Sequence, residues 1–192
     1  MSASSIDASG WLSSARRIVS PNCDERPPGS AVELVVIHAI SLPPDQFGGS
    51  GVAQLFTNTL AADEHPYYAG IVQLRVSAHF FIRRDGELIQ FVPVGARAWH
   101  AGASSWRGRE RCNDFSVGIE LEGCDTLPFE PVQYRVLDAL LGVLARHLPI
   151  VDVQGHSDIA PGRKTDPGPC FDWSAIATGM ARCRHEPPPA TL

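Results

Sequence analysis

Two histidines and one aspartate stand where a metal ion could bind. His38 ends a continuously apolar run, His156 comes shortly after a second predicted strand, and Asp166 comes ten residues later in a segment rich in proline and glycine. Two imidazoles and one carboxylate, with a fourth position left for water, are a common ligand set for catalytic zinc. Singly, each of these residues is more often structural. An aspartate before proline, for example, usually forms a turn. Together the three residues predict a zinc site.

A hydrolytic zinc site also needs a proton acceptor. Zinc lowers the pKa of a coordinated water from about 15.7 towards ~7, and a base must then take the second proton of that water and pass it to the leaving nitrogen. Glu120 suits this role because the alternation from Phe115 turns Val117, Ile119 and Leu121 to one side. Glu122 shares the face of Glu120, and alternation alone does not separate them.

A lysine near the predicted ligands could stabilise the transition state. Hydrolysis of an amide places negative charge on the carbonyl oxygen, and losing one donor to that oxygen typically costs about 3 to 4 kcal/mol. Lys164 lies two residues before Asp166 and could reach the oxyanion. A loop lysine on its own is usually a surface residue.

The elements that must position these side chains can be placed coarsely. Apolar runs predict strands at 34–38 and 150–153, and a spacing of apolar residues predicts a short helix over 52–60. The Asp-Gly pair at 85–86 predicts a hairpin between runs 78–82 and 88–92. Helices are expected from Pro131 to before Pro149 and after Asp172, a candidate N-cap. The expected class is α+β, with one mixed sheet flanked by helices.

Two segments are expected to be ordered loops. Residues 99–113 are polar, glycine-bearing and aperiodic, and residues 157–169 contain three prolines and two glycines, so neither is expected to hold regular structure. Long loops inside compact domains are usually functional.

Composition limits the class of protein. A chain of 192 residues is expected to form one domain over 1–192, with 184–192 a frayed tail, and we expect a monomer. The net charge of −5 and the absence of any Lys/Arg run argue against nucleic acid and anionic membrane as partners. No apolar stretch of signal-peptide or membrane-span length is found, and five scattered cysteines indicate reduced thiols, so a cytoplasmic location is expected.

Several long sequence words, in order, resemble one family. From Gly10 to Trp173 the chain resembles the AmpD family of cytoplasmic 1,6-anhydro-N-acetylmuramoyl-L-alanine amidases, relatives of phage amidase lysozymes and peptidoglycan-recognition proteins. The words are HAISLPP (38–44), RVSAHFFIRRDGE (75–87), AWHAG (98–102), RCNDFSVGIELEG (111–123) and GHSDIAPGRKTDPGP (155–169). The resemblance implies that His38, His156 and Asp166 hold zinc, that Glu120 rather than Glu122 accepts the proton, and that Lys164 stabilises the transition state.

The resemblance also implies substrate contacts. Tyr67 matches an active-site aromatic, Arg75 and Arg111 match positions that would meet peptide carboxylates, and Trp99 could stack on sugar. Packing of the aromatic residues and surface salt bridges of the arginines are the competing interpretations. Ala39 departs from the asparagine expected after the first zinc histidine and puts the strictness of the anhydro-sugar preference in doubt; Gly162 replaces a larger polar residue.

The resulting hypothesis is a zinc amidase that cleaves the bond between (1,6-anhydro-)N-acetylmuramic acid and L-alanine in muropeptides during cell-wall recycling. Two alternatives remain. An amidase of intact peptidoglycan would share the chemistry but need export or release by lysis. A non-catalytic muropeptide-binding module should lack a metal ligand or the catalytic glutamate. This chain keeps the three predicted ligands, Glu120 and Lys164.

Overall fold

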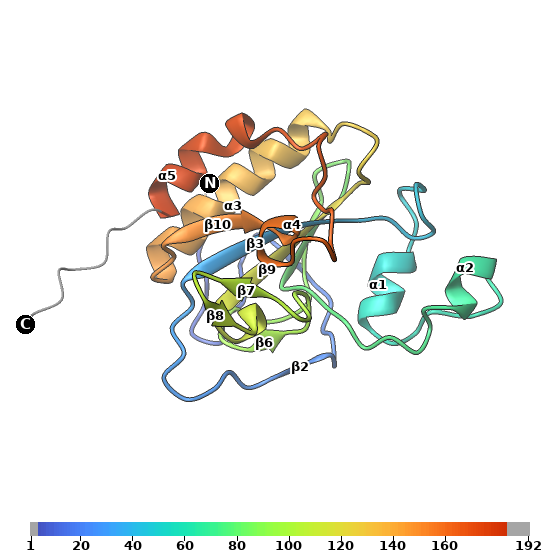
Figure 1. Cartoon of the computed structure of the whole chain (residues 1–192), viewed down its shortest axis with the longest axis horizontal. Coiled ribbons are helices and arrows are strands. Elements are labelled where there is room, and N and C mark those ends of the chain that lie inside the picture. Colours follow the sequence, from blue (N-terminus) through green and yellow to red (C-terminus); the bar gives the residue numbers. More distant parts are fainter. Residues whose placement is uncertain (1–3, 184–192) are drawn as a thin grey trace, which may run out of the picture.

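The apolar run that begins at Leu34 forms a long inner strand of a six-stranded sheet, around which the rest of the chain is arranged (Figure 1). The computed structural model describes residues 4–183. Its strands are β1 (Arg16–Arg17), β2 (Cys23–Asp24), β3 (Leu34–Ile40), β4 (Phe80–Ile82), β5 (Leu88–Gln90), β6 (Arg97–Ala98), β7 (Ser105–Trp106), β8 (Arg109–Glu110), β9 (Ser116–Glu122) and β10 (Asp152–Gly155). Its helices are α1 (Gly51–Phe56), α2 (Pro66–Ala69), α3 (Pro131–His147), α4 (His156–Ile159) and α5 (Ala177–Cys183), with 3₁₀ turns η1 (Cys112–Phe115) and η2 (Trp173–Ile176).

The sheet is mixed, with the order β1-β5-β4-β9-β3-β10. Strands β4, β9, β3 and β10 are mutually parallel, whereas β5 runs antiparallel to β4 through the predicted hairpin. Parallel neighbours bring their carboxyl ends to one edge, where open sheets commonly place their sites. The expected α+β class with a mixed sheet and flanking helices is confirmed.

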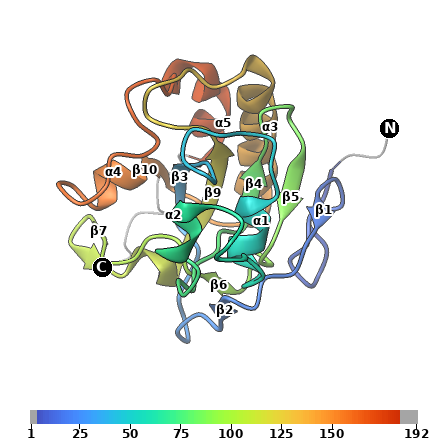
Figure 2. The ribbon, with the colours of Figure 1, turned by 90° about the vertical axis from the view of Figure 1, so that its right-hand side faces the viewer.

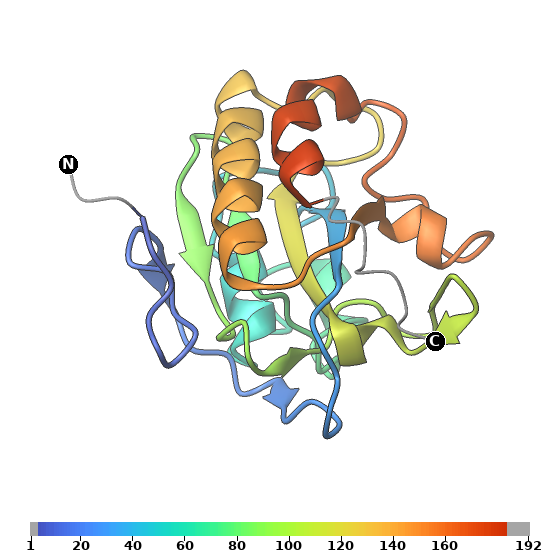
Figure 3. The same ribbon diagram turned by 90° about the vertical axis from the view of Figure 1, so that its left-hand side faces the viewer.

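Helices α3 and α5 cover one face of the sheet (Figure 3). Val117, Ile119 and Leu121 of β9 all belong to the buried core on this side, as the alternation predicts. Pro131 starts α3 because proline needs no amide partner in the first turn. The predicted N-cap is also present, since Asp172 Oδ1 accepts from the Ser174 amide at 2.9 Å.

The opposite face of the sheet carries the side chains of His38 and Glu120. A single row runs across the sheet from Phe81 of β4 through Glu120 of β9 to His38 of β3, since these residues are register partners. Helix α1 packs on the β4–β5 side of this face, and it lies with α2 on the side of the molecule away from α3 and α5 (Figures 1 and 2). Strand β9 is therefore buried on both faces.

Several predicted boundaries were wrong. His38 lies inside β3 rather than at its end, because the strand continues to Ile40 by pairing with β9. The segment 157–169 is not wholly irregular, since α4 begins at His156 and is held by the Asp158 carboxylate, which accepts from the Gly155 amide at 2.8 Å. Strand β10 starts two residues later than expected, and the 99–113 loop contains the β7–β8 hairpin.

Helix α1 ends at Phe56, short of the predicted Leu60. Within residues 4–183, no helix is long and apolar enough to cross a bilayer. The predicted frayed tail, 184–192, lies outside the described residues.

Candidate active site

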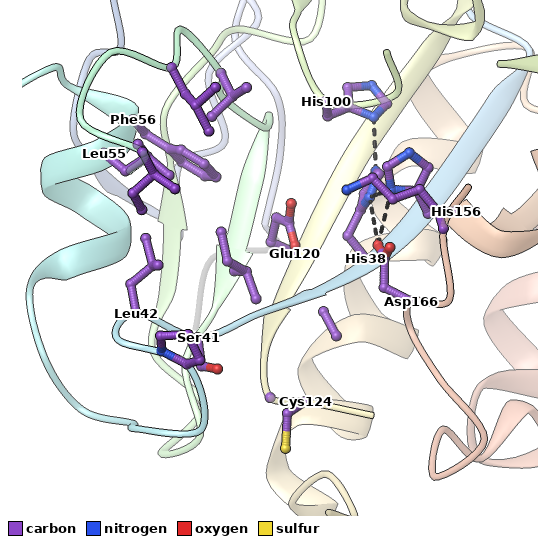
Figure 4. A pocket seen from close by; sticks show the side chains of 18 of the residues that line it. His38, Ser41, Leu42, Leu55, Phe56, His100, Glu120, Cys124, His156 and Asp166 are labelled. Atoms are coloured by element: carbon purple, nitrogen blue, oxygen red, sulfur yellow. Dashed lines mark hydrogen bonds and ion pairs between the residues drawn. The ribbon is translucent and has the colours of Figure 1, made fainter. Parts of the chain in front are cut away.

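The predicted ligands His38, His156 and Asp166 converge at one point (Figure 4). The Nδ1 atoms of the two histidines are 2.9 Å apart, and each lies 3.1 Å from Asp166 Oδ2. They come from adjacent parts of the fold, because β3 and β10 are parallel neighbours and the segment after α4 returns Asp166 to their carboxyl ends. Residues far apart in the sequence thus form one compact triangle.

The other nitrogen of each histidine ring is engaged behind this triangle. His156 Nε2 lies 3.1 Å from the Ala101 carbonyl oxygen, which can only accept, so a neutral ring carries its proton on Nε2 and leaves Nδ1 bare. His38 Nε2 lies 2.9 Å from His100 Nδ1. His156 Nδ1 can therefore offer a lone pair to an ion, and His38 Nδ1 can do the same when the proton of its ring lies on Nε2.

The charges of the triangle favour a cation. Burial lowers the pKa of His38 to about 4, so its ring is neutral at pH 7. Burial alone would raise the pKa of Asp166, but the contacts with His156 and His38 outweigh it, and the carboxyl pKa lies below its ordinary range. A carboxylate oxygen that faces an imidazole nitrogen at 3.1 Å is repelled by it unless a proton or a cation is shared between them.

The triangle has the dimensions of a metal site. Tetrahedral zinc with bonds of about 2.0–2.1 Å places its ligand atoms about 3.3 Å apart, close to the observed separations. Nitrogen, nitrogen and oxygen donors on one side leave room for further ligands from the cleft. His38, His156 and Asp166 could thus hold a metal ion.

Glu120 lies beside this cluster on the floor of the same cleft (Figure 4). Its side chain is buried, and Oε2 has no hydrogen-bond partner among the described residues. Burial, and secondly the Asp166 charge, raise the pKa of this carboxyl well above its ordinary value. An orphaned buried carboxylate with a raised pKa is suited to taking and returning a proton.

Glu122 is separated from Glu120 by its contacts. Its Oε1 accepts from the Gly48 amide at 2.6 Å, and its Oε2 accepts from the Arg84 amide at 3.0 Å. Glu122 therefore connects the loop before α1 to the β4–β5 turn, and it does not line the cleft. Of the two glutamates, Glu120 alone therefore lines the cleft.

The cleft has a volume of about 610 Å³ and includes Lys164 and two of the predicted substrate contacts. Tyr67 and Trp99 line it, and Tyr67 is 46% exposed. Trp99 is also held from behind, as its Nε1 donates to Asp24 Oδ1 at 3.1 Å. An exposed aromatic at a cleft wall can contact a ligand, whereas pure packing would have buried it.

The two predicted arginines do not line the cleft. Arg75 is exposed, and its guanidinium donates to the Val72 and Leu74 carbonyl oxygens. Arg111 is 3.3 Å from the Asp114 carboxylate and has a left-handed backbone, with φ of 62°. Their roles toward peptide carboxylates stay predictions.

His100 lies in the sequence word AWHAG, and no role was predicted for it from the sequence. His100 contacts His38, and the backbone amides of His100 and Ala101 donate to Asn113 Oδ1 at 3.1 and 2.8 Å. The available signal was a histidine two residues before a glycine in a long polar loop. Without the strand register, nothing connected it to His38.

The cleft at the carboxyl ends of the parallel strands has the features of a hydrolase active site. Comparisons with known proteins identify the family. The family model for N-acetylmuramoyl-L-alanine amidase (Amidase_2) matches residues 28–169. AmpD of Citrobacter freundii, a 1,6-anhydro-N-acetylmuramyl-L-alanine amidase, is 56% identical over 92% of this chain and 96% of that protein.

Solved structures agree. A crystal structure of a selenomethionine AmpD derivative is 55% identical, with a TM-score of 0.87, and covers 90% of this chain and 97% of that one. The amidase AmiD from E. coli, in complex with the substrate anhydro-N-acetylmuramic acid-L-Ala-D-γ-Glu-L-Lys, is 30% identical, with a TM-score of 0.53, over 92% of this chain and 65% of that one.

The chain belongs to the N-acetylmuramoyl-L-alanine amidase family. The resemblance to AmpD and the assignment as an enzyme are thereby confirmed, and the non-catalytic module is excluded.

Proposed function

We propose that this chain is a zinc-dependent amidase that separates 1,6-anhydro-N-acetylmuramic acid from the L-alanine of muropeptides during cell-wall recycling. The observation that carries the proposal is the triangle of His38, His156 and Asp166 beside the orphaned carboxylate of Glu120. The similarity to AmpD of Citrobacter freundii, a 1,6-anhydro-N-acetylmuramyl-L-alanine amidase, supports the choice of sugar and amino acid.

The metal would be held by His38 Nδ1, His156 Nδ1 and Asp166 Oδ2. When bound at such a site, zinc polarises a carbonyl and makes water acidic enough to attack near neutral pH. The neutral imidazole of His38 and the ionised carboxylate of Asp166 are in the protonation states that metal ligands must have.

Glu120 would move the proton. Its Oε2 takes a proton from the attacking water and returns it to the leaving nitrogen of L-alanine as the amide C–N bond breaks. The raised pKa suits both steps, because a carboxyl with an ordinary pKa would be a poor acid at neutral pH.

Lys164 would stabilise the negative charge on the former carbonyl oxygen. It lines the cleft with Glu120 and Asp166, and its ammonium group donates hydrogen bonds in any direction. We assign Tyr67 and Trp99 to contacts with the sugar or peptide in the cleft, and Arg75 and Arg111 to peptide carboxylates beyond it.

A cytoplasmic location is proposed on one ground besides the resemblance. All five cysteines are free. Persistent free thiols are typical of reducing compartments.

The test is turnover of purified protein on anhydro-muropeptide beside intact sacculi, each with and without a chelator. Release of peptide from anhydro-muropeptide, loss of turnover on chelation and about one zinc atom per chain by elemental analysis are expected. Full activity in metal-free protein would refute the zinc mechanism. Faster cleavage of sacculi would instead support an amidase of intact peptidoglycan.

A further inference from the structure

Of the three proposed metal ligands, the two histidines both contact one dipeptide, His100-Ala101, on the side away from the metal site. The side chain of His100 contacts His38 Nε2 at 2.9 Å, and the backbone carbonyl of Ala101 contacts His156 Nε2 at 3.1 Å. A short segment of the 99–113 loop thus reaches both imidazoles. Groups that fix the ring and proton of a metal-bound histidine are commonly as important as the ligand itself.

His100 can accept a hydrogen bond from His38 only in one tautomer. His100 Nε2 lies 3.2 Å from Ser116 Oγ, which can either donate or accept. If His38 Nε2–H donates to His100 Nδ1, then His100 carries its own proton on Nε2 and donates to Ser116. In the opposite arrangement the His38 proton sits on Nδ1, where it blocks metal binding.

The position of His100 is fixed by several independent contacts. Asn113 Oδ1 accepts from the backbone amides of His100 and Ala101. The imidazole lies over Gly118 of β9, where a Cβ atom would stand 2.4 Å from His100 Cγ. Arg163 Nη2 donates to the Ala101 carbonyl at 2.7 Å. The ring is therefore held in one place relative to His38.

We propose that His100 is a positioning residue that holds His38 in its Nε2–H tautomer and directs Nδ1 at the metal, with Ser116 as the acceptor at the far end. This inference rests on the proposed zinc site. It assigns His100 no contact with substrate, although its ring borders the cleft.

The test compares His100→Leu with His100→Asn. The Oδ1 of asparagine can take the place of His100 Nδ1 and still accept from His38, whereas leucine cannot. Zinc affinity, measured by competition with a chromophoric chelator, should fall about 10- to 100-fold in His100→Leu and by less than about tenfold in His100→Asn. His79→Asn is the matched control, since His79 lies beside His100 but contacts neither His38 nor His156. This variant should bind zinc as the parent does.

A second measurement reads the proton directly. Long-range ¹⁵N NMR of the zinc-loaded protein should show His38 and His100 both as Nε2–H tautomers. An Nδ1–H tautomer of His100, unchanged zinc affinity in His100→Leu, or an equal loss in His79→Asn would overturn the inference.

Two further outcomes separate the positioning role of His100 from protein folding and from the proposed zinc site. If His100→Leu shows no cooperative unfolding, Ser116→Ala replaces it, and unchanged zinc affinity in that variant would contradict the inference. If the parent protein binds no zinc, the proposed function fails as well. If the parent binds zinc and substitution of His100 leaves the zinc affinity unchanged, only the positioning role of His100 is contradicted.

Discussion

His38 of β3 and Glu120 of β9 are direct register partners on adjacent parallel strands. Side chains at paired positions of parallel strands point to the same face, so the proposed ligand and the proposed proton acceptor share one cleft floor. Strand pairing, rather than the loops, therefore sets the distance between the proposed metal ligand His38 and the proposed proton acceptor Glu120.

Glu120→Gln should lower kcat by about 10²- to 10⁴-fold, because the amide cannot take the proton of the attacking water. Zinc content should stay near one atom per chain, since Glu120 is outside the ligand triangle. Steady-state kinetics with elemental analysis checks both. Near-normal turnover would remove Glu120 from the mechanism.

Glu122→Gln is the matched control on the same strand and should affect stability rather than chemistry. One of the two backbone donors, Gly48 or Arg84, loses its carboxylate acceptor, which should cost about 1–3 kcal/mol of unfolding free energy. Denaturant unfolding measures this cost. A loss of turnover as large as in Glu120→Gln, with the fold intact, would reverse the assignment of the two glutamates.

Lys164→Met should reduce kcat by about 10²- to 10³-fold, since one donor to the developing oxyanion is lost. Lys164→Arg keeps the charge and should recover part of the rate. Zinc affinity should be the same in both variants. If Lys164→Met raises KM alone, then the lysine contributes to binding and not to the transition state.

Asp166→Ala should lose zinc and activity together, because the remaining two imidazoles make a weaker site. Adding zinc should raise the melting temperature of the metal-free parent, which binds the ion only when folded, and should leave that of Asp166→Ala nearly unchanged. Calorimetry with and without zinc compares them. Equal shifts in the two proteins would place the ion elsewhere.

His79 should make the metal-free protein less stable in acid. Burial, and secondly the Arg26 guanidinium, lower the pKa of His79 from 6.5 to about 3. The unfolded chain therefore binds a proton that the folded protein does not, so stability is complete above about pH 6.5 and falls as the pH drops towards 3. This residue accounts for a slope of up to about 1.4 kcal/mol per pH unit.

His79→Asn isolates that contribution, since asparagine can still accept from the Gly118 amide but does not titrate. The variant should show a shallower fall of unfolding free energy between pH 6 and 4 (roughly the window set by these pKa values). Parallel curves for the two proteins would mean that His79 does not stay neutral in the folded state.

The alternation in 116–122 was enough to place Val117, Ile119 and Leu121 under α3, because the period of a strand is a local property. It was also enough to put Glu120 on the other face. The alternation could not predict that this second face is covered, because the layer that covers it comes from residues 42–76 and 99–115.

The cluster of His38, His156 and Asp166 was recognisable because each follows a strong local signal in the sequence. The partnership of His38 with His100 was not, because it depends on strand register and on the path of a loop. Likewise, the helical turn that starts at His156 arises from the Asp158 carboxylate capping Gly155, in a segment whose prolines suggested only a loop.

Gly118 shows how the site constrains the sequence at a distance. Judged by strand propensity alone, a valine in the middle of β9 would seem an improvement on glycine. A Cβ atom there would collide with the His100 ring, and the collision would reach His38 through that ring. A stability-driven redesign of this amidase would therefore select against the proposed metal site unless position 118 were held fixed.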